Sequence, residues 1–311
     1  MKPLALVLGS GGTAGGAFHA GVLKALQDTW GIDPRQADTI IGTSAGALTG
    51  ALIAAGLSAD DIFRRETGKP LSAKGAELLG RARALLGDRQ TARSSLGRPA
   101  APEILGHVLR QPWSVAPASI AAALLPRGAV PTTAVQALTN GLLGSTWPTV
   151  PHLRVCAVAM ATGKRVIFDE STNVAPALAV AASCSVPGVF APVSIDGKDY
   201  FDGVVHSSDN LDVLRHDPHH IVIVSSPTSA DRITDRPGPW SGLRAYTRAQ
   251  TDYARRRLGS SARVEIIRPT GDDLDAMGPN MLDRARRPAV AMQAYATASE
   301  VFRRLDPPTA R

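Results

Sequence analysis

Short apolar runs alternate with segments of helical periodicity over the first 55 residues of the chain. An apolar run at Leu4–Leu8 leads into a glycine-rich stretch, after which apolar positions recur with helical spacing from about residue 17 to residue 28. A second run at residues 38–41 precedes a segment of small and aliphatic residues at 47–55. This order of strand, helix, strand and helix predicts a parallel sheet covered by helices.

The remainder of the chain continues this pattern around a proline-rich middle segment. Residues 69–151 contain alanine- and arginine-rich helical pieces broken by prolines, which predicts a helical insertion or cap. Further strands are predicted at 153–159, 165–168, 221–224 and 264–267, and helices at 174–183, 243–258 and 289–305. The Asp196-Gly197 dipeptide between two apolar runs predicts a hairpin turn. We expect a three-layer α/β/α sandwich with a mostly parallel sheet, in which residues 1–225 form the main domain and residues 226–311 complete it.

Composition narrows the class of protein. The chain of 311 residues is 44% hydrophobic and 20% charged with a mean hydropathy near zero, as is typical of a globular protein. Its longest charge-free stretch, at residues 128–153, is interrupted by prolines, and the first residues lack the basic segment and cleavage site of a signal peptide. Two cysteines, Cys156 and Cys184, suit a reducing compartment. We therefore expect a cytoplasmic protein.

The chain is basic. The 34 basic and 27 acidic residues give a net charge of +7, and arginines occur in runs such as Arg255-Arg256-Arg257. A solvated helix face explains such runs most simply, and attraction to an anionic membrane surface is the functional alternative. No aromatic platform or nucleic-acid-binding motif accompanies the arginines, so we expect no nucleic-acid partner.

A serine lies in a pattern that favours nucleophilic catalysis. Gly42, Ser44 and Gly46 form a Gly-x-Ser-x-Gly motif between a predicted strand and a predicted helix. Flanking glycines allow the sharp turn that projects a serine hydroxyl above a sheet edge, and the following helix N-terminus favours developing negative charge. The alternative is an ordinary turn at the start of a helix.

The glycine-rich stretch at residues 9–16 is a candidate anion-binding loop. Each glycine costs backbone entropy, and so many in one loop favour close approach to a ligand. Backbone N–H groups at a helix start hold an oxyanion or a phosphate. Gly9, Gly11 and Ala14 also fit a variant dinucleotide-binding fingerprint. Beside a serine elbow, an oxyanion hole is the simpler interpretation.

An activated serine needs a base. Asp202 follows a short predicted strand and precedes a glycine, which is a typical place for an active-site carboxylate. His206 lies four residues later and is the alternative, as the third member of a Ser-Asp-His triad. The remaining cluster, His216, His219 and His220, is interpreted as a surface turn rather than a metal site.

These motifs, in this order, resemble those of the patatin-like phospholipase family. The family's glycine loop, serine elbow and Asp-Gly pair correspond to the three motifs above, with Gly203 completing the pair. The most specific similarity is the segment at residues 181–192 together with residues 195–203, which resembles the stretch that leads to the family's catalytic aspartate. The resemblance covers roughly residues 4–225 and is loose across the helical middle.

The resemblance implies a Ser-Asp dyad, with Ser44 as the nucleophile and Asp202 as the general base. It places the oxyanion hole on the backbone of Gly11, Gly12 and Thr13. The implied activity is calcium-independent hydrolysis of the ester of a phospholipid, lysophospholipid or other lipid, with no metal and no cofactor. The implied partner is the lipid substrate, and the basic charge of the chain leaves an anionic membrane surface as the alternative to a solvated helix face.

The chain departs from the family pattern at three positions. Thr13 replaces the third glycine of the loop, Gly15 stands where a basic residue is usual, and Val204 replaces a small residue. His19 is expected to pack against the loop or orient it. Two other classes stay open: an esterase whose triad uses His206, and a non-catalytic module that binds a nucleotide or a lipid.

Overall fold

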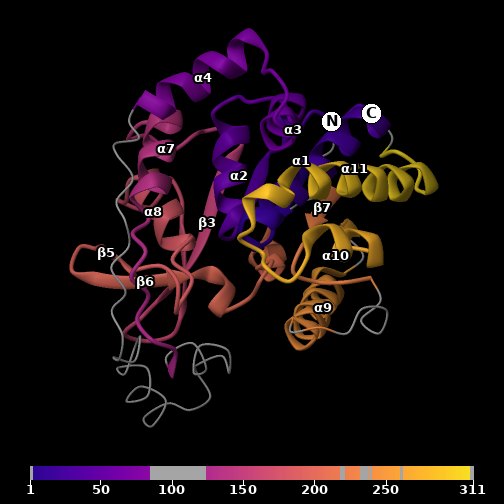
Figure 1. Ribbon diagram of the computed structural model, residues 1–311. Coiled ribbons are helices and arrows are strands. Elements are labelled where there is room, and N and C mark those ends of the chain that lie inside the picture. The colour runs from indigo at the N-terminus through magenta and orange to yellow at the C-terminus, as the bar shows by residue number, and fades with distance from the viewer. Residues whose placement is uncertain are drawn as a thin grey trace.

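A mostly parallel sheet lies at the centre of the molecule, with helices on both of its faces (Figure 1). The computed structural model describes residues 3–84, 124–217, 221–231, 238, 240–259 and 262–308. The described strands are β1 (Leu4–Leu8), β2 (Thr39–Gly42), β3 (His152–Ala159), β4 (Arg165–Phe168), β5 (Val193–Ile195), β6 (Lys198–Asp202), β7 (Ile221–Ser225) and β8 (Arg263–Ile267). Their order is β5-β6-β3-β2-β1-β7-β8, and β4 pairs with β3 beside this path. Strands β3, β2, β1, β7 and β8 are mutually parallel, whereas β4, β5 and β6 join by antiparallel pairing.

The alternation of side chains along β1 divides the core into two layers. Leu4, Leu6 and Leu8 belong to the larger core cluster, which also takes in α1, α2 and α11. Ala5 and Val7 point to the other face, where the cluster includes α9 and the short helix η4. Successive side chains of a strand point to opposite faces, so this central strand is buried on both sides. The expected three-layer α/β/α sandwich is confirmed.

The helices that build these layers come from the whole length of the chain. They are α1 (Gly12–Trp30), α2 (Ala45–Ala54), α3 (Ala59–Thr67), α4 (Ala73–Ala84), α7 (Thr133–Leu143), α8 (Pro176–Ser183), α9 (Ser241–Leu258), α10 (Gly271–Met277) and α11 (Arg287–Arg304), with the short 3-10 helices η1 (Pro34–Gln36), η3 (Gly203–Val205), η4 (Leu211–His216) and η6 (Arg284–Arg286). Helix α11 lies along α1, and Gly21 permits this contact because a Cβ there would lie 2.5 Å from the Ala291 carbonyl oxygen. Among the described helices, none is long and apolar enough to cross a membrane.

The predicted elements agree with the structure except at the glycine-rich stretch. The hairpin turn is confirmed, with Asp196 at φ 50° and Gly197 at φ 74°. The first helix, expected from residue 17, instead begins at Gly12. Low helix propensity made residues 12–16 look like loop, but tertiary packing holds them in a helical turn. Residues 85–123 of the expected cap lie outside the described residues, and the division into domains stays a prediction.

The register of the sheet aligns the two ends that carry the candidate serine and aspartate. Gly42, at the end of β2, faces Val155 on β3. Two residues further along β3, Ala157 faces Asp202 at the end of β6. Since Ser44 also lies two residues beyond Gly42, both side chains reach the same level of the sheet edge.

Candidate active site

Ser44 occupies the tight turn between β2 and α2, with φ 55° and ψ −118°. A positive φ strains a residue that has a Cβ, and such strain persists only where the surroundings enforce it. The two neighbouring glycines are required because there is no room for a side chain at either position. A Cβ at Gly42 would lie 2.5 Å from the Ala47 Cα, and one at Gly46 would lie 1.9 Å from the Leu8 carbonyl oxygen. The sequence motif is therefore a steric requirement of this turn.

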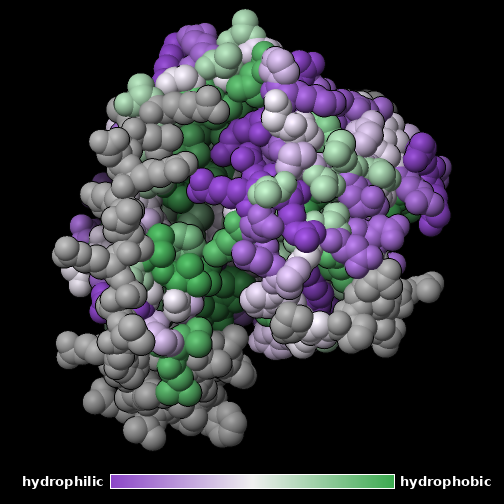
Figure 2. Space-filling view, in the orientation of Figure 1, coloured by the Kyte–Doolittle hydropathy of each residue, from purple (hydrophilic) through white to green (hydrophobic). Residues whose placement is uncertain are grey.

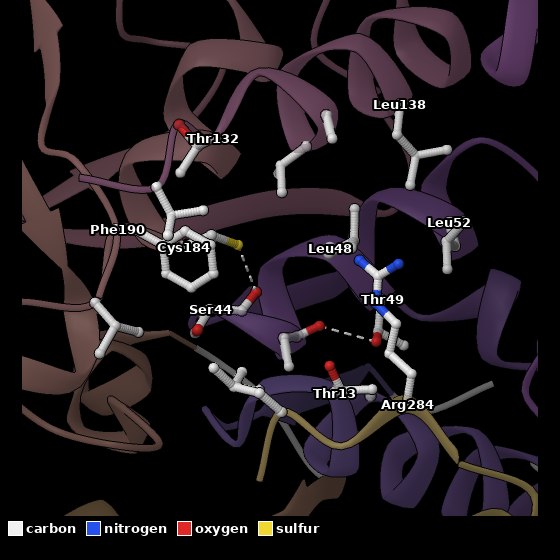
Figure 3. A pocket seen from close by; sticks show the side chains of 18 of the residues that line it. Thr13, Ser44, Leu48, Thr49, Leu52, Thr132, Leu138, Cys184, Phe190 and Arg284 are labelled. Carbon is white, nitrogen blue, oxygen red and sulfur yellow. Dashed lines mark hydrogen bonds between the residues drawn. The ribbon is translucent and has the colours of Figure 1, made fainter. Parts of the chain in front are cut away.

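The end of α8 fixes the serine backbone from the other side. The Ser44 N–H donates to the Ser183 Oγ at 2.9 Å, and this hydroxyl donates in turn to the Cys156 carbonyl at 2.6 Å. The Cys184 thiol donates to the Ser44 carbonyl at 3.4 Å, as Figure 3 shows. The segment at residues 181–192, which carried the most specific resemblance, thus supports the elbow directly.

Asp202 ends β6 and is fully buried. Its Oδ1 accepts a hydrogen bond of 2.9 Å from the Val204 N–H, while its Oδ2 has no partner of normal geometry in the described part of the chain. The next residue must be glycine, because a Cβ at Gly203 would lie 2.4 Å from the Cys156 carbonyl oxygen. The carboxylate is left with one oxygen uncommitted.

Burial raises the pKa of Asp202 to about 7. The Ser44 hydroxyl and the Val204 N–H oppose this shift, because both stabilise the charged form. The Ser44 hydroxyl is thus close enough to affect the pKa of the carboxylate, although no hydrogen bond of normal geometry joins the two side chains. A carboxylate that titrates near neutral pH has the proton affinity that a general base needs.

The start of α1 presents free backbone donors. The N–H groups of Gly11, Gly12 and Thr13 have no acceptor within the described residues, whereas the next N–H, that of Ala14, donates to the Met281 carbonyl at 2.9 Å. The first N–H groups of a helix lack partners within the helix and suit an anion. All three positions expected for an oxyanion hole therefore have available donors.

His19 holds the loop from beneath. It is fully buried, and its Nε2 lies 2.8 Å from the Gly9 carbonyl oxygen, which only accepts. Burial lowers the pKa of His19 to about 4, so the ring is neutral and Nε2 carries its proton. Nδ1 must then accept from the Ser225 hydroxyl at 2.8 Å. The expected role in orienting the loop agrees with these contacts.

A cavity of about 1050 Å³ opens above the serine. Ser44, Gly12 and Thr13 line its floor. Figure 3 shows the side chains of Ser44 and Thr13 there. Its apolar walls are formed by Leu48, Leu52, Ile62, Val135, Leu138 and Phe190. Figure 2 shows hydrophobic residues gathered in this hollow, with hydrophilic residues along one side. The cavity suits an acyl chain that ends at the serine.

The sequence was compared with models of known protein families. The family described as patatin-like phospholipase matches residues 6–215, which is more than half of the chain. The chain belongs to the patatin-like phospholipase family. No curated protein sequence matches it.

Two solved structures are similar to this patatin-like chain. VipD from Legionella pneumophila has a TM-score of 0.46 at 12% identity, and the match covers 97% of this chain and 67% of VipD. The type III effector protein ExoU has a TM-score of 0.39 at 15% identity, and the match covers 97% of this chain and 53% of ExoU. The patatin-like chain therefore spans about half of ExoU and two thirds of VipD.

The three departures from the patatin-like motifs differ in consequence. Thr13 and Val204 contribute backbone N–H groups, which their side chains leave unchanged. Gly15 is packed closely, since a Cβ there would lie 3.3 Å from Pro227 and 3.6 Å from the Ala45 Cβ. The loop consequently has no charged side chain of its own.

No histidine in the described part of the chain is hydrogen-bonded to Ser44 or Asp202. His206 has Arg165 and Asp212 as its charged neighbours, and no hydrogen bond joins it to Ser44 or Asp202. His216 lies at the end of η4, and the other two histidines of its cluster lie outside the described residues. The described residues contain no group of three His, Cys, Asp or Glu side chains that could hold a metal ion.

A second buried acid, Asp209, was missed from the sequence. Its Oδ2 accepts from the Ser226 hydroxyl at 2.7 Å and the Thr251 hydroxyl at 2.5 Å, and burial raises its pKa to about 6. A Cβ at Gly9 would lie 2.2 Å from its Oδ1, so the carboxyl packs against the glycine loop. No local motif marks Asp209, because its partners are distant in the sequence.

The start of α11 and the segment before it were also missed, although they form one wall of the site. Leu282, Arg284 and Arg287 line the cavity, and a Cβ at Gly12 would lie 2.9 Å from the Leu282 side chain. These residues lie beyond the family match, which ends at residue 215. Only the packing of this segment against the start of α1 brings them to the serine.

Proposed function

We propose that the protein is a serine acyl hydrolase that cleaves lipid esters with Ser44 as the nucleophile and Asp202 as the general base. The observation that carries this proposal is the uncommitted Oδ2 of a fully buried carboxylate that lies close to a strained serine. Burial without a cationic partner costs free energy, which favours a functional reason for this carboxylate. Family membership supports a lipid ester as the substrate.

The proposed reaction proceeds in two steps. Asp202 accepts the Ser44 proton while the hydroxyl oxygen attacks the ester carbonyl, and the departing alcohol takes that proton as the acyl-enzyme forms. Water then attacks the acyl-enzyme, gives its proton to Asp202, and the fatty acid leaves as Ser44 is reprotonated. Ser44 and Asp202 return to their starting protonation states.

The proposed oxyanion hole consists of the free N–H groups at the start of α1. Gly12 and Thr13 line the cavity floor beside Ser44, and Gly11 precedes them with its N–H also free. These donors are fixed before the reaction, because His19 and Asp209 hold the loop through Gly9. Removing one such donor typically costs about a hundredfold to a thousandfold in rate.

The proposed substrate has an acyl chain and is taken from a lipid assembly, with the protein acting peripherally at that surface. The apolar wall of the cavity includes Leu48 and Phe190. Transfer of an acyl chain from water to this wall is favourable, because it removes apolar surface from water. The chemistry uses side chains and backbone amides alone, so we propose no metal and no cofactor.

The test is release of fatty acid from a panel of lysophospholipids, phospholipids and monoacylglycerols of equal chain length. We expect the wild-type protein to release fatty acid and Ser44→Ala to release none above background. A folded wild-type protein that releases none from any of these lipids, with or without vesicles, would overturn the proposal.

A further inference from the structure

Among the described residues, four charged side chains line the cavity, and three of them are arginines. Arg65 and Arg287 both pair with Glu66, at 2.6 Å in each case. Glu66 is buried, and the Arg287 guanidinium also donates to the Arg65 carbonyl at 3.2 Å. This glutamate therefore holds Arg65 and Arg287 at the polar side of the cavity.

Arg284 is the remaining cation. It is exposed in η6, lines the cavity, and has no hydrogen-bond or ion-pair partner within the described part of the chain. Figure 3 shows its side chain extending into the cavity toward Thr49, on the side where Thr13 lies. Among the described residues, Arg284 therefore adds a positive charge without an ion-pair partner to the polar side of the cavity.

The position of Arg284 is fixed by packing against the glycine loop. The Ala14 N–H donates to the Met281 carbonyl, and Leu282 contacts Gly12. Arg284 follows Leu282 by two residues, so its backbone is anchored to the same turn that presents the free N–H groups. An anion at Arg284 and an ester at Ser44 consequently occupy one cavity.

We infer that Arg284 forms a subsite for the phosphate of a phospholipid head group. A guanidinium binds phosphate through parallel hydrogen bonds, and the uncharged glycine loop offers no competing side chain. The apolar wall takes the acyl chain, while the phosphate, separated from the ester only by glycerol, lies against Arg284. This inference rests on the proposed hydrolysis and specifies that phosphate-bearing lipids are preferred to neutral ones.

The first experiment compares two esters with the same acyl chain, lysophosphatidylcholine and monoacylglycerol, in neutral mixed micelles at constant ionic strength. We expect Arg284→Gln to lower kcat/KM for lysophosphatidylcholine about tenfold and to change that for monoacylglycerol less than about twofold. Arg284→Lys, which keeps a charge without the paired donors, should fall between wild type and Arg284→Gln.

The matched control is Arg303→Gln. Arg303 is also an exposed arginine, but it lies in the last turn of α11, about 24 Å along that helix from Arg287. Both substitutions remove one charge, so a general electrostatic effect on micelle binding would appear equally in both. We expect Arg303→Gln to leave the ratio of the two kcat/KM values unchanged.

A binding experiment separates this inference from the proposed hydrolysis. On a Ser44→Ala background, decylphosphocholine should bind about tenfold more weakly after Arg284→Gln, and decyl glycerol ether should bind equally. If Arg284→Gln weakens decylphosphocholine binding but wild type hydrolyses no lipid, the result would contradict the proposed hydrolysis and support the subsite.

Two results would overturn the subsite. The first is an unchanged preference and unchanged decylphosphocholine binding in Arg284→Gln while hydrolysis persists. The second is a result in which inorganic phosphate inhibits monoacylglycerol hydrolysis by wild type but not by Arg284→Gln, while both proteins bind decylphosphocholine equally. That second result would assign the arginine to a free anion instead of a lipid head group.

Discussion

Two buried carboxylates belong to the candidate site, one close to Ser44 and one packed against the glycine loop. Asp202 and Asp209 are both removed from water, both have a raised pKa, and each has one oxygen without a partner among the described residues. Asp209 accepts two hydroxyl hydrogen bonds and packs against Gly9. Asp202 accepts one backbone N–H and lies close to Ser44.

The comparison shows that burial alone does not identify a catalytic base. Both carboxyls have the perturbed pKa that draws attention to functional sites. Only Asp202 combines that perturbation with a nucleophile in reach and an oxygen left free to accept its proton. We therefore assign Asp202 to chemistry and Asp209 to holding the loop, and the following changes test that division.

Asp202→Asn is expected to have the largest effect. The amide keeps the shape of the side chain but cannot accept the serine proton as a carboxylate does, so kcat should fall about a thousandfold. Steady-state release of fatty acid measures this, and a thermal melt confirms that the variant is folded. Retention of a tenth or more of wild-type kcat would remove Asp202 from the mechanism.

The pH dependence of kcat is the next largest effect. Asp202 must be deprotonated to act as a base, and its pKa is raised to about 7, so activity should rise about tenfold per pH unit below that value and level off above it. An activity profile that is flat from pH 5 to pH 8, measured with a substrate that does not itself titrate, would contradict this assignment.

Stability should move in the opposite direction over the same range. Because the pKa of Asp202 in the folded state exceeds its value of 3.8 in the unfolded chain, the folded protein binds the extra proton and loses stability as pH rises from about 4 to about 7. The difference in free energy of unfolding between wild type and Asp202→Asn should fall by on the order of 4 kcal/mol across this window. Denaturant titrations at several pH values measure it, and the subtraction cancels the other buried acids.

Asp209→Ala should separate loop support from chemistry. Loss of its two hydroxyl hydrogen bonds should lower the free energy of unfolding by about 2 kcal/mol at pH 5, where the carboxyl is protonated. Because the base remains, kcat should fall less than about tenfold. A loss as large as that of Asp202→Asn would place both acids in the chemistry.

His206→Ala is expected to have the smallest effect. Its charged neighbours are Arg165 and Asp212, and the proposed reaction does not use it. We expect kcat to change less than about twofold. Loss of more than a hundredfold, in a variant with the wild-type melting temperature, would favour a Ser-Asp-His triad instead.

Sequence reasoning identified the parts of the site that are encoded locally. Gly42, Ser44 and Gly46 follow a strand and precede a helix, so their turn can be predicted from adjacent residues. Asp202 ends a hairpin strand before a glycine, which is also a local signal. The resemblance to a family then related two segments that are far apart in the chain.

The parts that were missed depend on contacts between distant segments. The helix at Gly12 starts earlier than propensity predicts, and Asp209 and Ser183 have hydrogen-bond partners that are distant in the sequence. Arg284 reaches the cavity because Met281 and its neighbours pack on α1. The hydrophobic periodicity within each segment does not indicate which distant segment it packs against, so these contacts could not be predicted from the sequence.

The most direct test of the central claim is covalent labelling of the serine. Wild type, Ser44→Ala and Asp202→Asn are incubated with a fluorophosphonate, which reacts with activated serine hydroxyls, and intact mass is followed over time with and without anionic vesicles. We predict a single adduct on wild type, none on Ser44→Ala, and strongly slowed labelling of Asp202→Asn. Equal labelling of wild type and Asp202→Asn, or an adduct that persists in Ser44→Ala, would contradict a nucleophile activated by this aspartate.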